Sequence, residues 1–502
     1  MKRIKLFLER WGLHAFLLPV FFVIHSYQQY YGLVSKTVAM KSGLAILLGT
    51  VVLFIIIQAL TKHMNKSLQL VTLYSFIFLF FGVVKDFLQL SLQIPIITKY
   101  SILLPITVVI AIVITRSILR KTDFRKINLF ENTLLLSLIV VDCISLSIPT
   151  ASSLLHNNSL VKQTSFHFNS SINDERPDVY YLVYDCYPGT QFLKDYMQFD
   201  NSRFDLELKK NEFYVIKKPK SNYNRTAFSI ASTLNFQYLQ DIQDHLVPNS
   251  KNYSQALLTI RQSNALKIFK FFNYKFYNLS IFDFENSPAV YKENFLTLPS
   301  ERILLYNSLI ERVRQDLSWN FNSPAFRKNE QFLNAYQLKK RDFNNLVIDS
   351  LLKLPFLPGA QPKFVYAHFY LPHPPFFYDS NGNSNNIQLV TDEKTFRNKT
   401  LFLSYLKYTN NKIIQICNAI KKGSNNKALI LLQSDHGFTD FEGGPVEPET
   451  FFKNYIALFS PDKDYSALYD TISNINTFPI IFNKYFGANI PLQKDSSIFL
   501  VN

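Results

Sequence analysis

Five long apolar runs fill the first 150 residues, and they limit the fold more than any other feature of this chain. A helix needs about 20 consecutive apolar residues to cross a hydrocarbon layer roughly 30 Å thick. The runs that reach or nearly reach this length cover residues 11–31, 42–60, 68–90, 96–119 and 127–149. The sequence therefore predicts a transmembrane domain of five helices over residues 1–150.

The placement of basic residues predicts how this bundle is oriented. They gather before the first run, between the second and third, and between the fourth and fifth: Lys2, Arg3, Lys5, Arg10, Lys62, Lys66, Arg116, Arg120, Lys121, Arg125 and Lys126. Cytoplasmic loops carry an excess of Lys and Arg, so we expect the N-terminus in the cytoplasm. Five is an odd number, so the rest of the chain is expected outside it. A signal peptide is the competing interpretation of the first run, but four further runs follow it.

The net charge of the chain belongs mostly to the membrane part. Through Thr150 there are 15 Lys and Arg and 5 Asp and Glu, which accounts for +10 of the formal net charge of +16. The basic balance thus reflects topology and does not indicate a nucleic-acid partner; the remaining +6 would at most favour the anionic surface of membrane lipid. Glu131 and Asp142 lie inside a run, and we expect hydrogen bonds within the bundle or an interfacial position for them.

The remainder of the chain alternates between strand and helix patterns. A polar stretch over residues 151–177 predicts a linker, and residues 178–502 then predict an extracytoplasmic domain. Strand candidates cover 178–184, 213–218, 274–282, 364–371, 427–433 and 454–461, and the longest helix candidates cover 326–352 and 391–422. This alternation is typical of an α/β fold with a largely parallel sheet.

Polar side chains follow three of these predicted strands. Asp185 ends the first, His368 and His373 lie at the end of the fourth, and Asp435 and His436 end the fifth. Ligands of open α/β sheets bind at the carboxyl ends of strands, and carboxylate with imidazole suits a divalent metal. The alternative for the last pair is a strand stopped by a polar turn, to which Gly437 gives backbone freedom.

Thr226 is predicted at or near the N-terminus of a helix. Free N–H groups and the helix dipole favour a bound phosphate or sulfate there, so the Thr226 hydroxyl is well placed to attack one. The alternative is an ordinary Thr that caps the helix. Arg225 beside it either holds an anionic group or faces solvent.

These segments in this order resemble the alkaline phosphatase superfamily. The resemblance is carried by the strand ending at Asp185, by Thr226, by HFYLPHPPF at 368–376 and by SDHG at 434–437. The chain is most similar to the membrane-anchored, sulfatase-like branch that includes lipoteichoic acid synthases and phosphoethanolamine transferases, which also carry five spans before an extracytoplasmic domain. The expected fold is therefore a five-helix transmembrane bundle followed by an α/β sulfatase-like, alkaline phosphatase-like domain.

The resemblance also implies a metal site and a nucleophile. One divalent ion, Mn²⁺ or Zn²⁺, would be held by Asp185, Thr226, Asp435 and His436, and Thr226 would form a covalent intermediate. His373, and less closely His368, would contact substrate together with Arg225. The implied function is a metal-dependent hydrolase or transferase acting on a phosphoester, such as a lipid head group or an envelope glycan. No second set of Asp and His ligands is evident, which disfavours a two-metal phosphatase site.

Two alternatives remain open. The first is a membrane protein that retains the fold as a structural or partner-binding module. The second is a true sulfuric ester hydrolase, whose modified Cys or Ser lies in a Cys/Ser-x-Pro-x-Arg motif; Cys186 and Pro188 fit this motif, but Thr190 stands where Arg is needed. Whether Cys186 pairs with Cys417 and which oligomer forms are not determined by the sequence.

Overall fold

The computed structural model describes residues 2–501 except 32–33, 35, 92–95, 148–158, 163, 165, 167, 169–175, 249, 291–299, 315–329, 439 and 446. The chain folds as two compact units. The first contains Met1–Asn158 and Leu298–Lys328, and the second contains Ser159–Thr297 and Asn329–Asn502. Most of the predicted linker at 151–177 and the predicted helix start near residue 326 lie outside the described residues.

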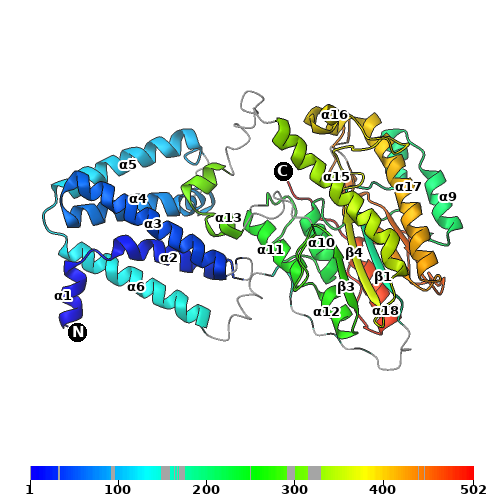
Figure 1. Ribbon diagram of the computed structural model, residues 1–502, viewed down its shortest axis with the longest axis horizontal. Coiled ribbons are helices and arrows are strands. Elements are labelled where there is room, and N and C mark those ends of the chain that lie inside the picture. Colours follow the sequence, from blue (N-terminus) through cyan, green and yellow to red (C-terminus); the bar gives the residue numbers. More distant parts are fainter. Residues whose placement is uncertain are drawn as a thin grey trace. The chain divides into compact units, whose positions relative to one another are not determined.

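The first unit consists mainly of long apolar helices, drawn in blue and cyan in Figure 1. They are α1 (Lys2–Arg10), α2 (His14–Gln29), α3 (Lys36–Thr61), α4 (Met64–Asp86), its π-helical extension η1 (Phe87–Ser91), α5 (Tyr100–Arg120) and α6 (Arg125–Ser147). Four of them, α3, α4 with part of η1, α5 and α6, are long and apolar enough to cross a membrane.

The first predicted span folds as the shorter helix α2. Its 16 residues extend about 24 Å at 1.5 Å per residue, less than a hydrocarbon layer, so the predicted count of five spans is not confirmed. The ionisable groups inside the bundle do form hydrogen bonds, as expected. Gln69 donates to Glu131 at 2.8 Å, and the imidazole of His25 lies 3.1 Å from Asp142.

Six strands form one mixed sheet in the second unit, in the order β2-β6-β5-β1-β4-β3. The strands are β1 (Val179–Tyr184), β2 (Tyr214–Val215), β3 (Lys275–Leu279), β4 (Lys363–Phe369), β5 (Leu429–Gln433) and β6 (Ile456–Phe459). Every predicted strand is thus confirmed. β1 has a fully apolar sequence and is buried on both faces, as expected for a central strand.

Helices cover both faces of this sheet. α10 (Thr226–Asn235) contacts α11 (Ser250–Arg261), α12 (Asn264–Phe271) and α18 (Asn474–Phe486) in one layer. In the other layer, α17 (Lys399–Gly423) contacts α15 (Glu330–Lys353) and α9 (Ser202–Lys210). The shorter elements are α8 (Thr190–Met197), η2 (Leu354–Phe356), α16 (Ile387–Thr391), η3 (Glu393–Arg397) and η4 (Pro448–Phe452).

Alternate residues of β1 face opposite layers. Tyr181 packs edge-on against Phe478 of α18, with ring centroids 5.0 Å apart, whereas Tyr184 stacks on Phe369 of β4 at 4.7 Å. This alternation places β1 in the middle of the core, so its carboxyl end is held rigidly.

Two structural predictions are wrong in detail. The sheet is not largely parallel throughout: β1, β3, β4 and β5 are parallel, but β6 pairs antiparallel with both β5 and β2. No long crossover helix separates β5 from β6 among the described residues, so the chain turns back on itself. The helix predicted over 391–422 begins instead at Lys399, because the side chain of Asn398 caps it by accepting from the N–H of Leu401.

One segment from the middle of the second unit's sequence belongs to the first unit. It contains α13 (Ser300–Leu304), and its described residues continue to Arg314. Ile303, Leu304 and Tyr306 form a small core with residues of α2 and α3. Arg312 pairs with Asp86 at the end of α4 and lies over the Tyr306 ring at 4.0 Å. The sequence analysis did not predict this arrangement.

Candidate active site

The parallel register of the central strands brings three polar strand ends together. Val183 of β1 pairs with His368 of β4 on one side and with Gln433 of β5 on the other. Asp185 and Asp435 each lie two residues beyond their paired positions, so they extend from neighbouring strands at the same level. The chain therefore places both carboxylates at the carboxyl edge of the sheet, where α/β proteins bind ligands.

The imidazole of His436 is the centre of this group. Its Nε2 lies 3.8 Å from Asp185 Oδ1, 3.4 Å from Asp435 Oδ2 and 3.3 Å from Thr226 Oγ1. The four residues that the resemblance implied as ligands therefore converge, although about two hundred residues separate the two pairs in the sequence. Their roles remain predictions at this point.

The hydrogen bonds of His436 direct Nε2 toward the other three side chains. Its Nδ1 lies 2.9 Å from the carbonyl oxygen of Gly437 and donates to it, so in the neutral ring Nε2 carries the lone pair. A backbone carbonyl that fixes the tautomer in this way is a common partner of metal-binding histidines.

Thr226 does not cap its helix. The N-cap of α10 is Arg225, with extended backbone, and Thr226 is the first helical residue. Its hydroxyl points to His436 instead, which excludes the ordinary capping role. Ser229, one turn later, donates to the carbonyl oxygen of Asp435 at 2.6 Å and ties α10 to the SDHG loop.

The buried polar atoms of this site fit a cation. Asp435 is 0% exposed, its Oδ1 accepts from the N–H groups of Cys186 and His436, and its Oδ2 has no hydrogen-bond partner among the described residues. Oδ2 and the Nε2 lone pair face each other at 3.4 Å without a hydrogen bond between them. Two buried acceptors in this arrangement are costly unless a positive ion lies between them.

His368 occupies the buried back of the site. It is 0% exposed, its Nδ1 lies 3.0 Å from the Tyr366 hydroxyl, and one of its ligand atoms lies within 4.8 Å of Asp185 and Asp435. Burial lowers the pKa of His368, partly offset by the two carboxylates, so the ring is neutral. A completely buried ring does not favour the predicted substrate contact and places His368 with the metal-facing groups.

His373 differs from His368 in being only half-buried. Its Nδ1 lies 2.5 Å from the Pro374 carbonyl oxygen, so Nδ1 donates to that oxygen and Nε2 is not used in this contact. Burial raises the pKa of Asp185, but electrostatic interaction with the imidazoles of His373, His436 and His368 lowers it more, so the pKa of Asp185 lies below its ordinary value. Arg225 acts electrostatically on Tyr253 of α11, and no described contact joins it to the four converging residues.

Cys186 is a site residue that the sequence analysis missed. Its thiol lies 3.2 Å from Asp185 Oδ1 and 4.0 Å from His436 Nε2. It is a free thiol, as are Cys143 and Cys417, so the disulfide left open by the sequence is absent. The sequence signals were its partial match to the Cys-x-Pro-x-Arg motif, which points to a modified residue and not to a metal ligand, and its place directly after Asp185, from which strand alternation would point it away.

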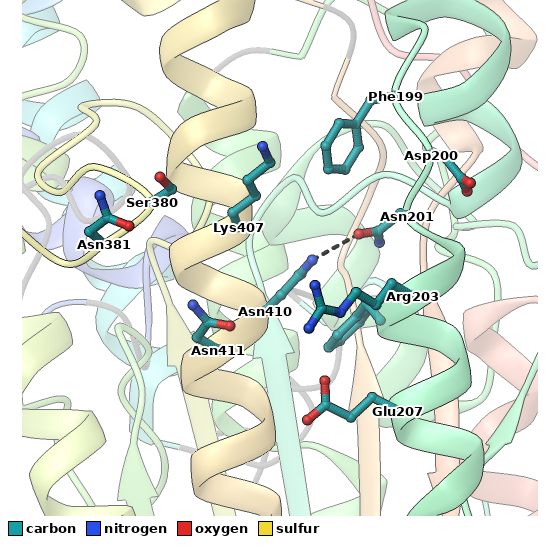
Figure 2. Close-up of a pocket in the computed structure, with 11 residues that line it drawn as sticks. Phe199, Asp200, Asn201, Arg203, Glu207, Ser380, Asn381, Lys407, Asn410 and Asn411 are labelled. Atoms are coloured by element: carbon teal, nitrogen blue, oxygen red, sulfur yellow. Dashed lines mark hydrogen bonds between the residues drawn. The ribbon is translucent and has the colours of Figure 1, made fainter.

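A separate polar pocket of about 540 Å³ lies between α9, α17 and the loop near Ser380. Figure 2 shows Asn410 donating to Asn201 across its floor, at 2.8 Å. Its lining contains equal numbers of basic and acidic side chains, namely Arg203, Lys407, Asp200 and Glu207. None of the converging site residues lines it. This pocket is therefore distinct from the candidate active site.

Comparison with known proteins gives the family. Residues 213–460 match the sulfatase family model. The chain carries a sulfatase domain. This match agrees with the predicted resemblance to the sulfatase-like branch of the alkaline phosphatase superfamily. The matched range contains Thr226, His368, His373, Asp435 and His436, whereas Asp185 and Cys186 precede it.

Several solved structures are similar at low identity. The zinc complex of the C-terminal periplasmic domain of EcEptC from Escherichia coli is 13% identical, with 67% of this chain and 92% of that chain covered and a TM-score of 0.39. The soluble domain of lipooligosaccharide phosphoethanolamine transferase A from Neisseria meningitidis is 12% identical, with 63% and 90% covered and a TM-score of 0.36. The phosphonate monoester hydrolase of Agrobacterium radiobacter is 9% identical, with 62% and 74% covered and a TM-score of 0.35. No curated protein matches this sulfatase-domain chain.

Proposed function

We propose that this sulfatase-domain protein is a metal-dependent phosphoester transferase or hydrolase that works through a covalent Thr226 intermediate. The observation that carries the proposal is the convergence of Thr226 Oγ1, Asp435 Oδ2 and Asp185 Oδ1 around His436 Nε2. Three of these atoms are anionic or carry lone pairs, and the fourth is a hydroxyl at a helix start. This set binds a cation and presents a nucleophile at the same place.

Asp185, Asp435, His436 and Thr226 would hold the divalent ion. When bound, such an ion favours the negative form of a hydroxyl oxygen and neutralises charge on a phosphoryl group. Oxygen, nitrogen and hydroxyl donors of this kind suit both Zn²⁺ and Mn²⁺.

The side chains then account for both halves of a transfer reaction. Thr226 Oγ1 forms a bond to phosphorus while the P–O bond to the leaving alcohol breaks, and that oxygen keeps the electron pair. His373, whose Nδ1 contacts the Pro374 carbonyl oxygen, would in its protonated form give the leaving oxygen a proton from Nε2. An acceptor hydroxyl or water next attacks phosphorus, the Thr226–phosphorus bond breaks, and the threonine hydroxyl is restored by a proton.

The membrane unit supports a substrate of the membrane or cell envelope. A phosphoester in a lipid head group is held close to any domain that is anchored in the same membrane. From the distribution of Lys and Arg we propose that the N-terminus lies in the cytoplasm, and that α2 crosses the membrane together with the four longer helices, so that the sulfatase domain lies outside the cytoplasm. Fusion of a topology reporter after Asn502 tests this placement, because activity of a cytoplasm-dependent reporter would contradict it.

A matched pair of substitutions on α10 tests the nucleophile. Thr226→Val and Thr233→Val both replace a hydroxyl by a methyl group, and the buried Thr233 hydroxyl has no hydrogen-bond partner among the described residues. We expect Thr226→Val to lower release of 4-nitrophenol from bis(4-nitrophenyl) phosphate by roughly 10³-fold or more, as for loss of a nucleophile. Thr233→Val should retain activity within about twofold.

The same assay separates the alternatives. Full activity of Thr226→Val would remove the covalent mechanism. Turnover of 4-nitrophenyl sulfate, together with an aldehyde at position 186 by mass spectrometry, would instead identify a sulfuric ester hydrolase. If the full-length protein binds no divalent ion at saturating Mn²⁺ or Zn²⁺, a non-enzymatic module is the better interpretation.

A further inference from the structure

We propose that Cys186 is a sulfur ligand of the metal site and that it makes the site select Zn²⁺ over Mn²⁺. The inference rests on the proposed function, because it adds a ligand to the same site. It assigns a role to a residue that lies outside the matched sulfatase range and that the proposed Thr226 mechanism does not use.

The distances among three of the five proposed donor atoms fit bonds to one ion at angles near the tetrahedral value. Cys186 Sγ lies 3.2 Å from Asp185 Oδ1 and 4.0 Å from His436 Nε2, and the latter two atoms lie 3.8 Å apart. Zinc bonds of roughly 2.0 Å to oxygen or nitrogen and 2.3 Å to sulfur, at tetrahedral angles, place donor atoms about 3.3–3.6 Å apart. Shifts of a few tenths of an ångström would therefore bring all three into coordination.

The backbone conformation of Cys186 brings its sulfur atom to the side on which the Asp185 side chain lies. In an extended strand, consecutive side chains point to opposite faces, so Cys186 would point away from Asp185. Instead, Cys186 has a φ of +59°, a left-handed conformation that is unfavourable for a residue with a Cβ atom. Its N–H donates to Asp435 Oδ1 at 3.1 Å, which holds the turn against the second carboxylate.

An independent observation points to a ligand at this place. Asp435 Oδ2 is buried and unpartnered among the described residues, and it faces His436 Nε2. Cys186 itself is only 5% exposed and forms no disulfide. A buried thiol, a buried carboxylate oxygen and an imidazole lone pair thus meet where no described positive side chain neutralises them.

The sulfur atom has a chemical consequence for metal choice. Binding forms a metal–sulfur bond, and the thiol proton is released to solvent. Thiolate is a soft ligand that favours Zn²⁺, whereas Mn²⁺ prefers oxygen ligands. A site with Cys186 in it should therefore hold Zn²⁺ more strongly, relative to Mn²⁺, than the same site with a hydroxyl at that position.

X-ray absorption at the zinc edge of the full-length protein in detergent tests the sulfur ligand directly. We expect a zinc–sulfur distance of about 2.3 Å in the unaltered protein and its loss in Cys186→Ser. Cys417→Ser, which removes a buried thiol of α17, is the matched control and should keep the sulfur signal. In competition between the two ions, Cys186→Ser should shift the Zn²⁺-to-Mn²⁺ affinity ratio toward Mn²⁺ by about tenfold or more.

The outcomes distinguish this inference from the proposed function. Bound zinc with only oxygen and nitrogen neighbours in the unaltered protein would refute the role of Cys186 and leave the metal site intact. Absence of any bound divalent ion from the unaltered protein at saturating Zn²⁺ or Mn²⁺ would refute both. Formylglycine at position 186 would also overturn the inference, since the sulfur would be gone.

Discussion

Asp435→Asn should stabilise the metal-free protein, although Asp435 is a central residue of the candidate site. The Oδ1 atom of asparagine can keep both backbone hydrogen bonds, from the N–H groups of Cys186 at 3.1 Å and His436 at 2.9 Å. The new Nδ2 group takes the place of Oδ2 and faces the Nε2 lone pair of His436 across 3.4 Å. A donor thus replaces an unpartnered, negatively charged acceptor.

The expected gain follows from these two changes. A new buried hydrogen bond contributes roughly 1 kcal/mol, and removal of an unsatisfied buried acceptor contributes about 1–3 kcal/mol. Allowing for imperfect geometry, we expect a gain of about 1–3 kcal/mol in the free energy of unfolding. At about 2–4 °C per kcal/mol for a large domain, the melting temperature should rise by roughly 2–12 °C.

Bound metal should reverse this difference in stability, so that the unaltered protein becomes more stable than Asp435→Asn. An ion that binds only the folded protein stabilises it by about 2.7 kcal/mol at one hundred times its dissociation constant. The unaltered protein should gain this amount, whereas Asp435→Asn has lost a charged ligand and should gain much less. Thermal unfolding in detergent, with EDTA and then with Zn²⁺, measures both quantities.

The control is Asp440→Asn, an exposed carboxylate that pairs with Arg397 at 3.0 Å. An exposed ion pair of this kind contributes about 0–1 kcal/mol, so this variant should stay close to the unaltered protein with and without metal. If Asp435→Asn lowers metal-free stability by more than about 1 kcal/mol, the inferred tautomer of His436 and the orphaned Oδ2 are both wrong.

Other substitutions test the surroundings of the site and the membrane unit. Gly437→Ala would place a Cβ atom 2.8 Å from the carbonyl oxygen of Lys453, so we expect a shifted SDHG loop and about tenfold weaker zinc binding by isothermal titration. Asp86→Asn removes the ion-pair partner of the buried Arg312, so protease cleavage within residues 300–314 should become several-fold faster. A double variant with Asp86→Arg and Arg312→Asp should restore resistance to the protease. Asn132→Leu removes three hydrogen bonds, at about 0.6 kcal/mol each inside a membrane protein, so resistance to unfolding in SDS should fall by roughly 2 kcal/mol.

The sequence alone located the elements that build the candidate site. Strands ending at Asp185 and Asp435 were predictable because a buried strand is a short apolar run that a polar residue ends abruptly. The start of α10 at Thr226 was predictable from helical spacing. These signals are local, so no knowledge of distant contacts was needed.

Some local predictions gave the right residue for an incomplete reason. Gly437 was expected to supply backbone freedom, but its φ is not positive; the absence of a Cβ matters because the carbonyl oxygens of Phe451 and Lys453 approach it closely. Thr226 was open between capping and catalysis until its hydroxyl was seen to face His436. Contacts between segments that are distant in the chain cannot be predicted from the sequence of either segment alone.

The sequence by itself determined the apolar membrane helices, the six strands and the polar residues that end three of them, since each depends on hydrophobic periodicity within one segment. Only the tertiary structure decided which side each polar group faces. The left-handed turn at Cys186 brings its thiol beside Asp185, strand register buries His368 completely, and residues 300–314 pack with the membrane helices. All three depend on backbone geometry and on contacts between segments far apart in the chain, and this is why the sulfur atom at the site was missed.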